Sequence, residues 1–541
     1  MNREAGYIAL VLHAHLPYVR HPEHQRSLEE RWLYEALWES YLPLLEVLER
    51  LERDGVSAPL TVSVSPPLAA MLRDDLLCRR FDDHLGRLER LAAHLARGEG
   101  VPREALAYAG CEGPALAFYS RRLDEVRAAW ERASGDVLSA LVAHDARGTI
   151  ELMTSTATHA YLPGLLGSKE AIRAQLRLGL RSFERITGLR PRGLWLPECA
   201  FDPRFEADLA AAGVRYTVLD AHGIELARPR PPLGIAAPIV GPSGVAFFAR
   251  DPDSARDVWS REHGYPGDAT YREFYRDVGF DLPEEALLGE LGPHGTRVST
   301  GLKLHRITGG DEKAPYDPEA AAALARQHAR DFLAGREAIA RELPGRAPLL
   351  IAPFDAELFG HWWFEGPIFL EEMLRALSAS ARAGGLQAST LGGYLARFPE
   401  ATRAEPAPST WGEGGFGAAW AGPEAARLWR HVHHAERRVR AATEARRGAT
   451  GLSGAALDQA IRELLLLQSS DWAFMLRQGE MTAYAEERVQ MHATRAARLA
   501  AIAEAHGPSA DDAAWARAVV EQDQFMRELE GESIRDAFDG W

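Results

Sequence analysis

The sequence predicts an α/β fold whose parallel strands close into a β/α barrel, and three observations support this. Short apolar runs without polar alternation recur along the chain, as they do in strands that are buried on both faces. Helical patterns separate most of these runs, which is the order of βαβ units. Polar, titratable residues gather directly after the runs, where a β/α barrel builds its active site.

Seven runs are predicted to be strands, and an eighth run has a weaker pattern. The seven span residues 7–12, 59–65, 149–155, 193–197, 215–220, 244–249 and 348–354, and the weaker run spans 385–390. A long helical pattern at 31–53 separates the first two runs. An open doubly wound sheet is the alternative, but no glycine-rich dinucleotide fingerprint follows the first strand.

Two stretches break the alternation of strands and helices. Residues from about 69 to 145 read as helices only, and so does the chain from about 423 onwards. We therefore expect three parts: a barrel of residues 1–68 and 146–410, a helical insertion of residues 69–145, and a C-terminal α-helical domain of residues 411–541 that contributes to the cleft.

Composition excludes several classes of protein. The 541 residues carry a net charge of −15, which argues against nucleic acid or an acidic membrane as a partner. The three cysteines are widely spaced and form no CxxC motif, so neither a disulfide framework nor a structural zinc site is expected. The amino terminus lacks the pattern of a signal peptide and no apolar run is long enough to span a bilayer, so we expect a cytoplasmic protein.

Two carboxylates at strand ends suggest cleavage of a glycosidic bond. Glu198 follows the fourth run, and Asp355 follows the apolar run 348–354. Such cleavage needs one carboxylate at the anomeric carbon and one acid that protonates the leaving oxygen. A lone acid more often caps a helix or pairs with an arginine. Here tryptophans stand beside both acids, and indole faces stack on sugar rings.

The histidines at the first strand end leave two chemistries open. His13 and His15 are two residues apart, so a strand places both on one face. Together with His159, or with Asp220 and His222, they could form the Zn or Mn site of a deacetylase or amidohydrolase. Alternatively, they donate hydrogen bonds to sugar hydroxyls. A serine hydrolase is less favoured, because no G-x-S-x-G elbow follows a strand.

Several long motifs give the chain a resemblance to a known family. They are HAHLPYVRHPE (13–23), STATHAYLP (155–163), WLPECAF (195–201), FDAELFGHWWFEGP (354–367), STWGEGG (409–415) and SSDWAF (469–474). With these motifs the chain resembles the α-1,4-glucan branching enzymes of glycoside hydrolase family fifty-seven over nearly its whole length. The resemblance implies an incomplete (β/α)7 TIM-like barrel with the helical insertion and the all-α C-terminal domain.

The resemblance also implies a mechanism and a set of site residues. It implies a retaining double displacement without metal or cofactor, in which Glu198 is the nucleophile and Asp355 the general acid/base. The substrate would be an α-1,4-glucan such as amylose or a glycogen-like polysaccharide, and the protein is expected to act as a monomer. The implied substrate-binding residues are His13, His15, His159, Trp259, His361, Trp362, Trp411, Trp420 and Asp471.

The choice of acceptor separates the remaining hypotheses. Water gives hydrolysis, a glucan 4-hydroxyl gives disproportionation, and a glucan 6-hydroxyl gives a branch. Branching members carry a tyrosine on a mobile loop over the cleft, whereas the corresponding segment 227–244 has none, and Gly417 stands where a bulky aromatic is expected. A branching enzyme is the leading hypothesis. The alternatives are an α-amylase-like hydrolase or 4-α-glucanotransferase, a metal-dependent carbohydrate deacetylase, and a non-catalytic glucan-binding protein.

Overall fold

The computed structural model describes residues 5–260, 263–310, 312–345 and 347–538. Each of the eight predicted runs contains a strand. These strands are β1 (Tyr7–Ala14), β2 (Leu60–Val64), β3 (Ile150–Ser155), β4 (Leu194–Trp195), β5 (Tyr216–Leu219), β7 (Ala246–Ala249), β10 (Leu349–Asp355) and β11 (Gln387–Ala388). Four short strands were not predicted: β6 (Ile239–Val240), β8 (His305–Arg306), β9 (Ala314–Pro315) and β12 (Thr402–Arg403).

The predicted strands pair in parallel, as their continuous apolar character indicates. One sheet has the order β10-β1-β2-β3-β4 with β11 beside β1, and a second has the order β12-β6-β7-β5. A parallel bridge between Gly193 and Tyr216 links β4 to β5. On the other side, the Asp251 N–H just after β7 donates to the Ile351 carbonyl of β10 over 2.8 Å. The chain is therefore an α/β protein with parallel strands and many helices.

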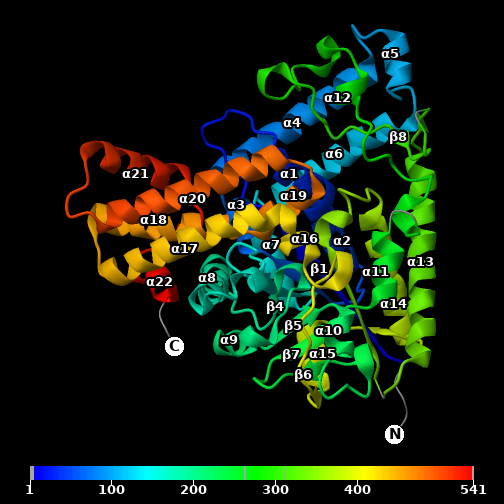
Figure 1. Cartoon of the computed structure of the whole chain (residues 1–541). Coiled ribbons are helices and arrows are strands. Elements are labelled where there is room, and N and C mark those ends of the chain that lie inside the picture. The colour runs from blue at the N-terminus through cyan, green and yellow to red at the C-terminus, as the bar shows by residue number, and fades with distance from the viewer. Residues whose placement is uncertain (1–4, 261–262, 311, 346, 539–541) are drawn as a thin grey trace.

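Helices of the strand–helix units surround these strands (Figure 1). They are α1 (Glu30–Ala36), α2 (Leu42–Arg53), α8 (Lys169–Thr187), α9 (Glu206–Ala211), α10 (Ala221–Glu225), α11 (Pro252–Trp259), α13 (Pro318–Glu342), α14 (Gly366–Arg382) and α15 (Leu391–Arg397). The short helix α12 (Val278–Asp281) lies away from the strands, at the top of Figure 1. None of the helices in the described part of the chain has both the length and the apolar character needed to cross a membrane.

The helix predicted at 31–53 is interrupted by a π-helical turn, η1 (Leu37–Tyr41), between α1 and α2. All five residues of this turn are buried. The Ser40 hydroxyl accepts from the His361 N–H over 3.1 Å, and the Tyr41 hydroxyl donates to Glu357. The wider π turn thus directs adjacent side chains towards the segment that follows β10, in line with the frequent occurrence of such turns at functional sites.

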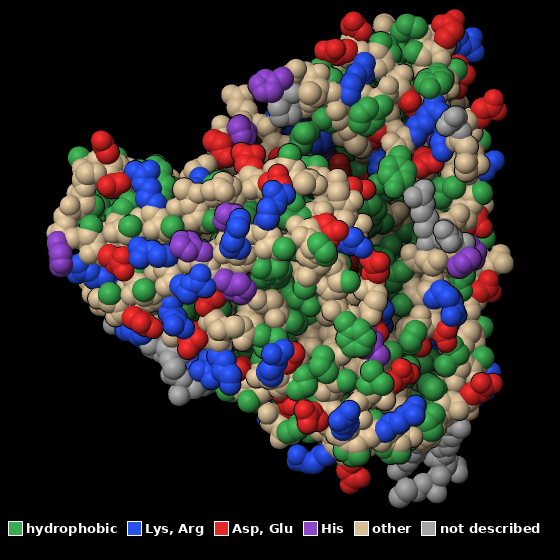
Figure 2. Space-filling model, viewed as in Figure 1, with side chains coloured by type: hydrophobic (Ala, Val, Ile, Leu, Met, Phe, Trp, Pro, Cys, Tyr) green, Lys and Arg blue, Asp and Glu red, His purple; other side chains and the backbone are tan. Residues whose placement is uncertain are grey.

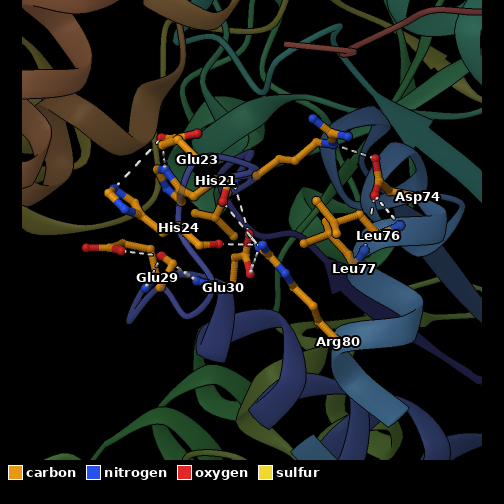
Figure 3. Close-up of polar contacts among 12 residues, drawn as sticks. His21, Glu23, His24, Glu29, Glu30, Asp74, Leu76, Leu77 and Arg80 are labelled. Atoms are coloured by element: carbon orange, nitrogen blue, oxygen red, sulfur yellow. Dashed lines mark hydrogen bonds and ion pairs between the residues drawn. The ribbon is translucent and has the colours of Figure 1, made fainter. Parts of the chain in front are cut away.

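The predicted insertion consists of helices, as expected. They are α3 (Pro66–Leu72), α4 (Asp75–Arg97), α5 (Arg103–Tyr108), α6 (Pro114–Arg132) and α7 (Val137–Arg147), with α4 to α6 at the upper right of Figure 1. In Figure 3 the guanidinium of Arg80, on α4, points at Glu30 of α1, and its Nη1 lies 2.7 and 2.8 Å from the two carboxylate oxygens. Glu30 is almost fully buried, so this pair anchors the insertion to the first helix.

The chain after residue 417 is also helical. Its α-helices are α16 (Ala418–Ala421), α17 (Ala426–Arg446), α18 (Gly451–Leu467), α19 (Ser470–Gln478), α20 (Thr482–Glu504), α21 (Ala510–Gln522) and α22 (Glu532–Arg535). The longer ones form the arm at the left of Figure 1, whereas α16 and α19 lie near the strands. The first N–H of α19, that of Ser470, donates to the His159 carbonyl over 3.0 Å, which ties the arm to the segment after β3.

Gly360 tests the packing of the turn after β10. Its φ is +126°, and a Cβ there would lie 1.8 Å from the Glu39 carbonyl oxygen in the π turn. We expect Gly360→Ala to lower the free energy of unfolding by about 3 kcal/mol or more, through backbone strain and overpacking. Gly384→Ala is the control, because φ is +82° there but nothing lies within 4 Å of the added Cβ. Equal thermal unfolding midpoints for the two variants would contradict this prediction.

Candidate active site

The carboxyl ends of the parallel strands bring together the polar residues that follow the apolar runs. His13, on β1, is in register with Asp355 of β10 on one side and with Ser63 of β2 on the other. Beyond the strand end, the His15 Nδ1 lies 2.8 Å from the Ser65 hydroxyl. The site is therefore built on neighbouring strand ends and is nearly as rigid as the sheet itself.

Glu198 reaches the site on a strained turn after β4. Its φ is +65°, and His159 and Cys199 also have positive φ, so three of the eight such non-glycine residues in the described chain lie here. Each costs roughly 1–3 kcal/mol and persists only where surrounding contacts enforce it. One such contact is the Trp411 N–H, which donates to the Glu198 carbonyl over 2.9 Å.

Two hydrogen-bond donors from residues outside the strands bind the Glu198 carboxylate. The Trp411 indole Nε1–H donates to Oε2 over 2.8 Å, and the Ser470 hydroxyl donates to Oε1 over 2.8 Å. The Glu198 side chain is only 12% exposed. Its burial raises its pKa to about 7, although both hydrogen bonds favour the charged form and oppose that rise.

A chain of hydrogen bonds leads from β2 to Glu198. The Ser63 hydroxyl lies 3.2 Å from His13 Nδ1, and His13 Nε2 lies 2.9 Å from His159 Nε2. His159 Nδ1 lies 2.9 Å from the Ser470 hydroxyl, which in turn donates to Glu198. Both imidazoles are buried, and burial together with the neighbouring His15 lowers the pKa of each, so both are neutral.

Neutral imidazoles allow one proton arrangement along this chain. Because the Ser470 proton points at Glu198, His159 must donate from Nδ1 and accept at Nε2. His13 must then donate from Nε2 and accept from Ser63 at Nδ1. Every donor therefore points along the chain towards the carboxylate, which stabilises its negative charge cooperatively.

His15 differs from the other two histidines, although its ring is stacked 3.7 Å from that of His159. Its Nε2 lies 3.2 Å from both carboxylate oxygens of Asp471. Burial lowers the pKa of His15, but Asp471, with smaller contributions from Glu198 and Glu357, raises it above its usual value overall. The imidazolium and Asp471 thus form an ion pair at the edge of the site.

In the described part of the chain, Asp355 lacks the hydrogen-bond donors that surround Glu198. Its carboxyl group receives no hydrogen bond from the described residues. Burial, followed by repulsion from Glu357 and Glu198, holds the pKa of Asp355 well above its usual value. A neutral acid beside a carboxylate that accepts two hydrogen bonds is the pairing that general acid and nucleophile need. This arrangement can protonate a leaving oxygen while the second carboxylate attacks.

Aromatic side chains extend from Glu198 towards the C-terminal helices. The Trp420 ring is stacked on Tyr161 at 5.7 Å and on Phe474 at 6.3 Å, and Trp420 itself is only 2% exposed. A Cβ on Gly417 would lie 1.9 Å from the Tyr161 hydroxyl, so Tyr161 fills the space expected for an aromatic residue at 417. Phe474 is 44% exposed, so it is the ring of this aromatic group that is open to solvent.

Trp259 and Trp362 line a second part of the site, a cavity of about 670 Å³. Trp362 is 54% exposed and Trp259 is 38% exposed, and the Trp259 ring lies 6.4 Å from that of Trp411. Figure 2 shows hydrophobic side chains over the middle of one face of the molecule, where Figure 1 places α16. The His361 Nδ1 lies 2.7 Å from Glu39, so this ring nitrogen already has a carboxylate partner.

Segment 227–244 does not lie at the catalytic edge, which corrects the interpretation that it covers the cleft. Within it, β6 pairs with the first residues of β7, and Leu233 lies beside Gly345 ahead of β10. The first residues of the parallel strands lie at one edge of the sheet. Asp355, the last residue of β10, lies at the opposite edge. The segment leads to the start of β7, at the edge where the parallel strands begin. It therefore does not cover the edge where Asp355 lies.

A group of three side chains with metal-type ligands does occur in the described chain, but it lies in the C-terminal helices. Its members are Glu463, His492 and Asp523. Arg495 lies 3.8 and 3.7 Å from the two carboxylates, so a cation already faces this group. At the strand ends, Asp220 lies 3.3 Å from His222 of the deacetylase hypothesis and 2.6 Å from Arg250, so a guanidinium already faces this carboxylate.

Comparison with known proteins identifies the family. A profile described as glycosyl hydrolase family 57 matches residues 9–278, and one described as the C-terminal part of 1,4-alpha-glucan branching enzyme matches residues 431–532. A 1,4-alpha-glucan branching enzyme of Thermococcus kodakarensis is 33% identical, covering 92% of this chain and 73% of its own. The chain belongs to glycosyl hydrolase family 57. The predicted family is thus confirmed.

Solved structures of the family share the whole fold. An α-amylase of Thermotoga maritima has a TM-score of 0.87 at 35% identity, covering 98% of this chain and 99% of its own. A branching enzyme of Pyrococcus horikoshii has a TM-score of 0.85 at 31% identity, covering 99% and 97%. A structure named an α-amylase and one named a branching enzyme therefore match the fold of this chain almost equally well.

Four residues of the site were not predicted from the sequence. Ser470 and Phe474 lie in the SSDWAF motif, which gave a signal for their segment but none for their roles. Glu357, which accepts from the His15 N–H over 3.1 Å, lies in the FDAELFGHWW motif. Phe274 lies in no recognised motif, and only the fold brings its ring to 4.7 Å from that of Trp362.

Ser470→Ala tests the donor chain through its pH profile. The variant removes a hydrogen bond to the charged form of Glu198, so the pKa of Glu198 rises further above about 7. A nucleophile must be ionised, so activity is lost as pH falls through this pKa. We expect the acidic limb of kcat/KM to move up by about one pH unit, because a hydrogen bond to a charge contributes roughly 1.5–3 kcal/mol.

Ser469→Ala is the matched control, because the Ser469 hydroxyl donates to Asp471 over 2.5 Å and not to Glu198. An unchanged acidic limb in Ser470→Ala would contradict the prediction. Nitrogen NMR of labelled imidazoles gives an independent measurement. It should show the proton on Nε2 of His13 and on Nδ1 of His159, and the reverse pair of tautomers would refute the proton arrangement.

Proposed function

We propose that this chain is a 1,4-α-glucan branching enzyme that cleaves α-1,4 bonds with retention and forms α-1,6 branches in a glycogen-type glucan. The observation that carries the proposal is the meeting of Glu198 and Asp355 at one strand edge, with the pKa of each raised by burial and with mutual repulsion raising that of Asp355. The named relatives and the profile over residues 431–532 support the branching reaction in particular.

The reaction would proceed in two displacements. Glu198 bonds to the anomeric carbon while Asp355 gives its proton to the departing glycosidic oxygen, and the α-1,4 bond breaks. Asp355 then takes the proton of an acceptor 6-hydroxyl, whose oxygen bonds to the anomeric carbon as the ester to Glu198 breaks. The sequence of events restores both carboxyl groups and needs no metal or cofactor.

The other predicted residues would divide into two roles. Trp259, Trp362 and Trp411 offer partly exposed rings to the glucan, and Trp420 would support Phe474, whose ring face is open. Four residues would act at the cleavage site mainly by positioning Glu198: His13, His15, His159 and Asp471. The ring nitrogens of these histidines already have hydrogen-bond partners, and Asp471 is the partner of His15. His361 would support the aromatic residues through Glu39.

We also infer the finer architecture. Strands β1, β2, β3, β4, β5, β7 and β10 would form the incomplete (β/α)7 barrel, supported by the Gly193–Tyr216 bridge and by the single hydrogen bond from Asp251 to β10. The helices within 69–145 and after residue 417 support the proposed insertion and C-terminal domain. A cytoplasmic location and a monomeric state stay predictions from the sequence.

An α-amylase-like hydrolase is the second candidate, and one observation favours it. Segment 227–244 contains no tyrosine and lies away from the catalytic edge, so it cannot shield the glycosyl-enzyme from water. The Thermotoga maritima neighbour with the same fold is named an α-amylase. Both candidates share the first displacement and differ only in the acceptor.

Incubation with amylose separates these candidates. We expect new α-1,6 linkages, measured by debranching and chain profiling, to exceed the new reducing ends measured in the same samples. The physical reason is that each transfer to a 6-hydroxyl conserves the number of reducing ends, whereas each hydrolysis adds one. A rise in reducing ends without new branch points would replace the branching proposal by the hydrolase.

Substitution of the two carboxylates tests the mechanism. Glu198→Gln and Asp355→Asn should each lower kcat by several orders of magnitude, because the two groups act as a unit. With a donor whose leaving group needs no proton, Asp355→Asn should accumulate a glycosyl-enzyme detectable by mass spectrometry, whereas Glu198→Gln should form none. Near wild-type activity in either variant would remove that residue from the mechanism.

A further inference from the structure

A pair of aromatic rings forms the floor of the cavity beside Asp355. The Trp362 and Phe274 rings are stacked with centroids 4.7 Å apart and planes 20° apart. Trp362 remains 54% exposed, and both residues line the cavity of about 670 Å³. An exposed indole supported by a second ring offers a flat apolar surface of the kind that matches the face of a pyranose.

The cavity is lined by the segment that follows Asp355 and reaches Glu198 through a pair of tryptophans. Leu358, Trp362 and Trp363 follow Asp355 in the chain and line the cavity. On its other side, Trp259 lies 6.4 Å from Trp411, which donates to Glu198. In the proposed mechanism Asp355 serves the oxygen that departs and the hydroxyl that arrives, so a sugar bound to the segment that follows Asp355 is placed on the acceptor side.

A buried ion pair fixes both rings of the floor. Arg272, two residues before Phe274, pairs with Glu39 at 2.8 Å, and both side chains are only 1% exposed. Glu39 also binds the His361 ring at 2.7 Å, next to Trp362 in the chain. The Arg272 N–H donates to Glu365 over 3.1 Å. The segments carrying the two rings are therefore attached to one rigid network.

The surroundings of the floor suit a hydroxylated ligand. The inserted helix α6 supports the network from behind, since the Arg272 Nη1 lies 3.1 Å from the Tyr119 hydroxyl. At the rim, Lys313 pairs with Glu273 at 2.6 Å, and both line the cavity. An apolar floor with charged groups at the rim matches a glucan, which has apolar ring faces and hydroxyl groups around the edge.

We propose that the Phe274–Trp362 pair is the binding floor for the acceptor glucan, and that Arg272 is the positioning residue that holds it. The inference rests on the proposed transglycosylation and names the part of the site that receives the acceptor. A bound acceptor would place its hydroxyl next to Asp355 and exclude water from the glycosyl-enzyme. The floor would therefore set the ratio of transfer to hydrolysis.

An α-maltooligosyl fluoride donor isolates this role, because its leaving group occupies no acceptor sugar site. Glu198 bonds to the anomeric carbon as the C–F bond breaks and fluoride leaves. The glycosyl-enzyme then passes to water or to added amylose. With Trp362→Ala and with Phe274→Ala, we expect glycosyl transfer to amylose per fluoride released to fall about threefold to tenfold, the range that an aromatic stacking contact supports.

Two comparisons sharpen this test. Trp362→Phe keeps an aromatic face and should retain most of the transfer. Tyr108→Ala is the matched control, because Tyr108 is 62% exposed and lies outside the residues lining the cavity. It should keep the wild-type ratio. A wild-type ratio in both Trp362→Ala and Phe274→Ala would overturn the proposal. Failure of the wild-type protein to release fluoride would overturn the proposed function itself, and this proposal with it.

Discussion

The burial of carboxylates at one edge of parallel strands is the constraint on which the rest of this structure depends. Glu198, Asp355 and Glu357 lose much of their hydration there, and burial is the largest cause of the raised pKa of each. A buried charge without donors costs several kcal/mol, so each ionised group must receive hydrogen bonds from the protein. The strands themselves cannot supply these donors, because their N–H groups bind neighbouring strands.

Distant segments supply the donors, which explains why the fold has its additional parts. Trp411 arrives on the segment that leaves β12, Ser470 begins α19, and Tyr41 comes from the π turn of the first helix pair. Asp355 receives no such donor from the described residues and therefore stays protonated more easily than Glu198. In the proposed mechanism, the difference between the acid Asp355 and the nucleophile Glu198 would thus originate in which strand end the distant segments reach.

From the sequence, the strands and the acids that follow them could be predicted, whereas the side chains around those acids could not. Continuous apolar runs predicted β1 to β5, β7 and β10, because burial on both faces leaves a local pattern. The π turn at Leu37–Tyr41 was not predicted, since its cause is tertiary: Glu39 must reach Arg272, which lies far away in the sequence. The prediction of His13 and His159 as sugar contacts could not include their hydrogen bonds to Ser63 and Ser470, because these join segments far apart in the sequence.

Bond cleavage and acceptor choice depend on different parts of the site, one buried and one exposed. In the proposed mechanism, cleavage depends on the protonation of Glu198 and Asp355, which is set by burial and by buried contacts. Acceptor choice depends on how long water is kept from the glycosyl-enzyme, which is a property of exposed surfaces. In this chain the exposed surface beside Asp355 is built from Phe274, Trp362 and Trp259, and segment 227–244 takes no part in it. Proteins named for hydrolysis and for branching can therefore share one fold, and we propose that in this chain the aromatic surface directs the glycosyl group to its acceptor.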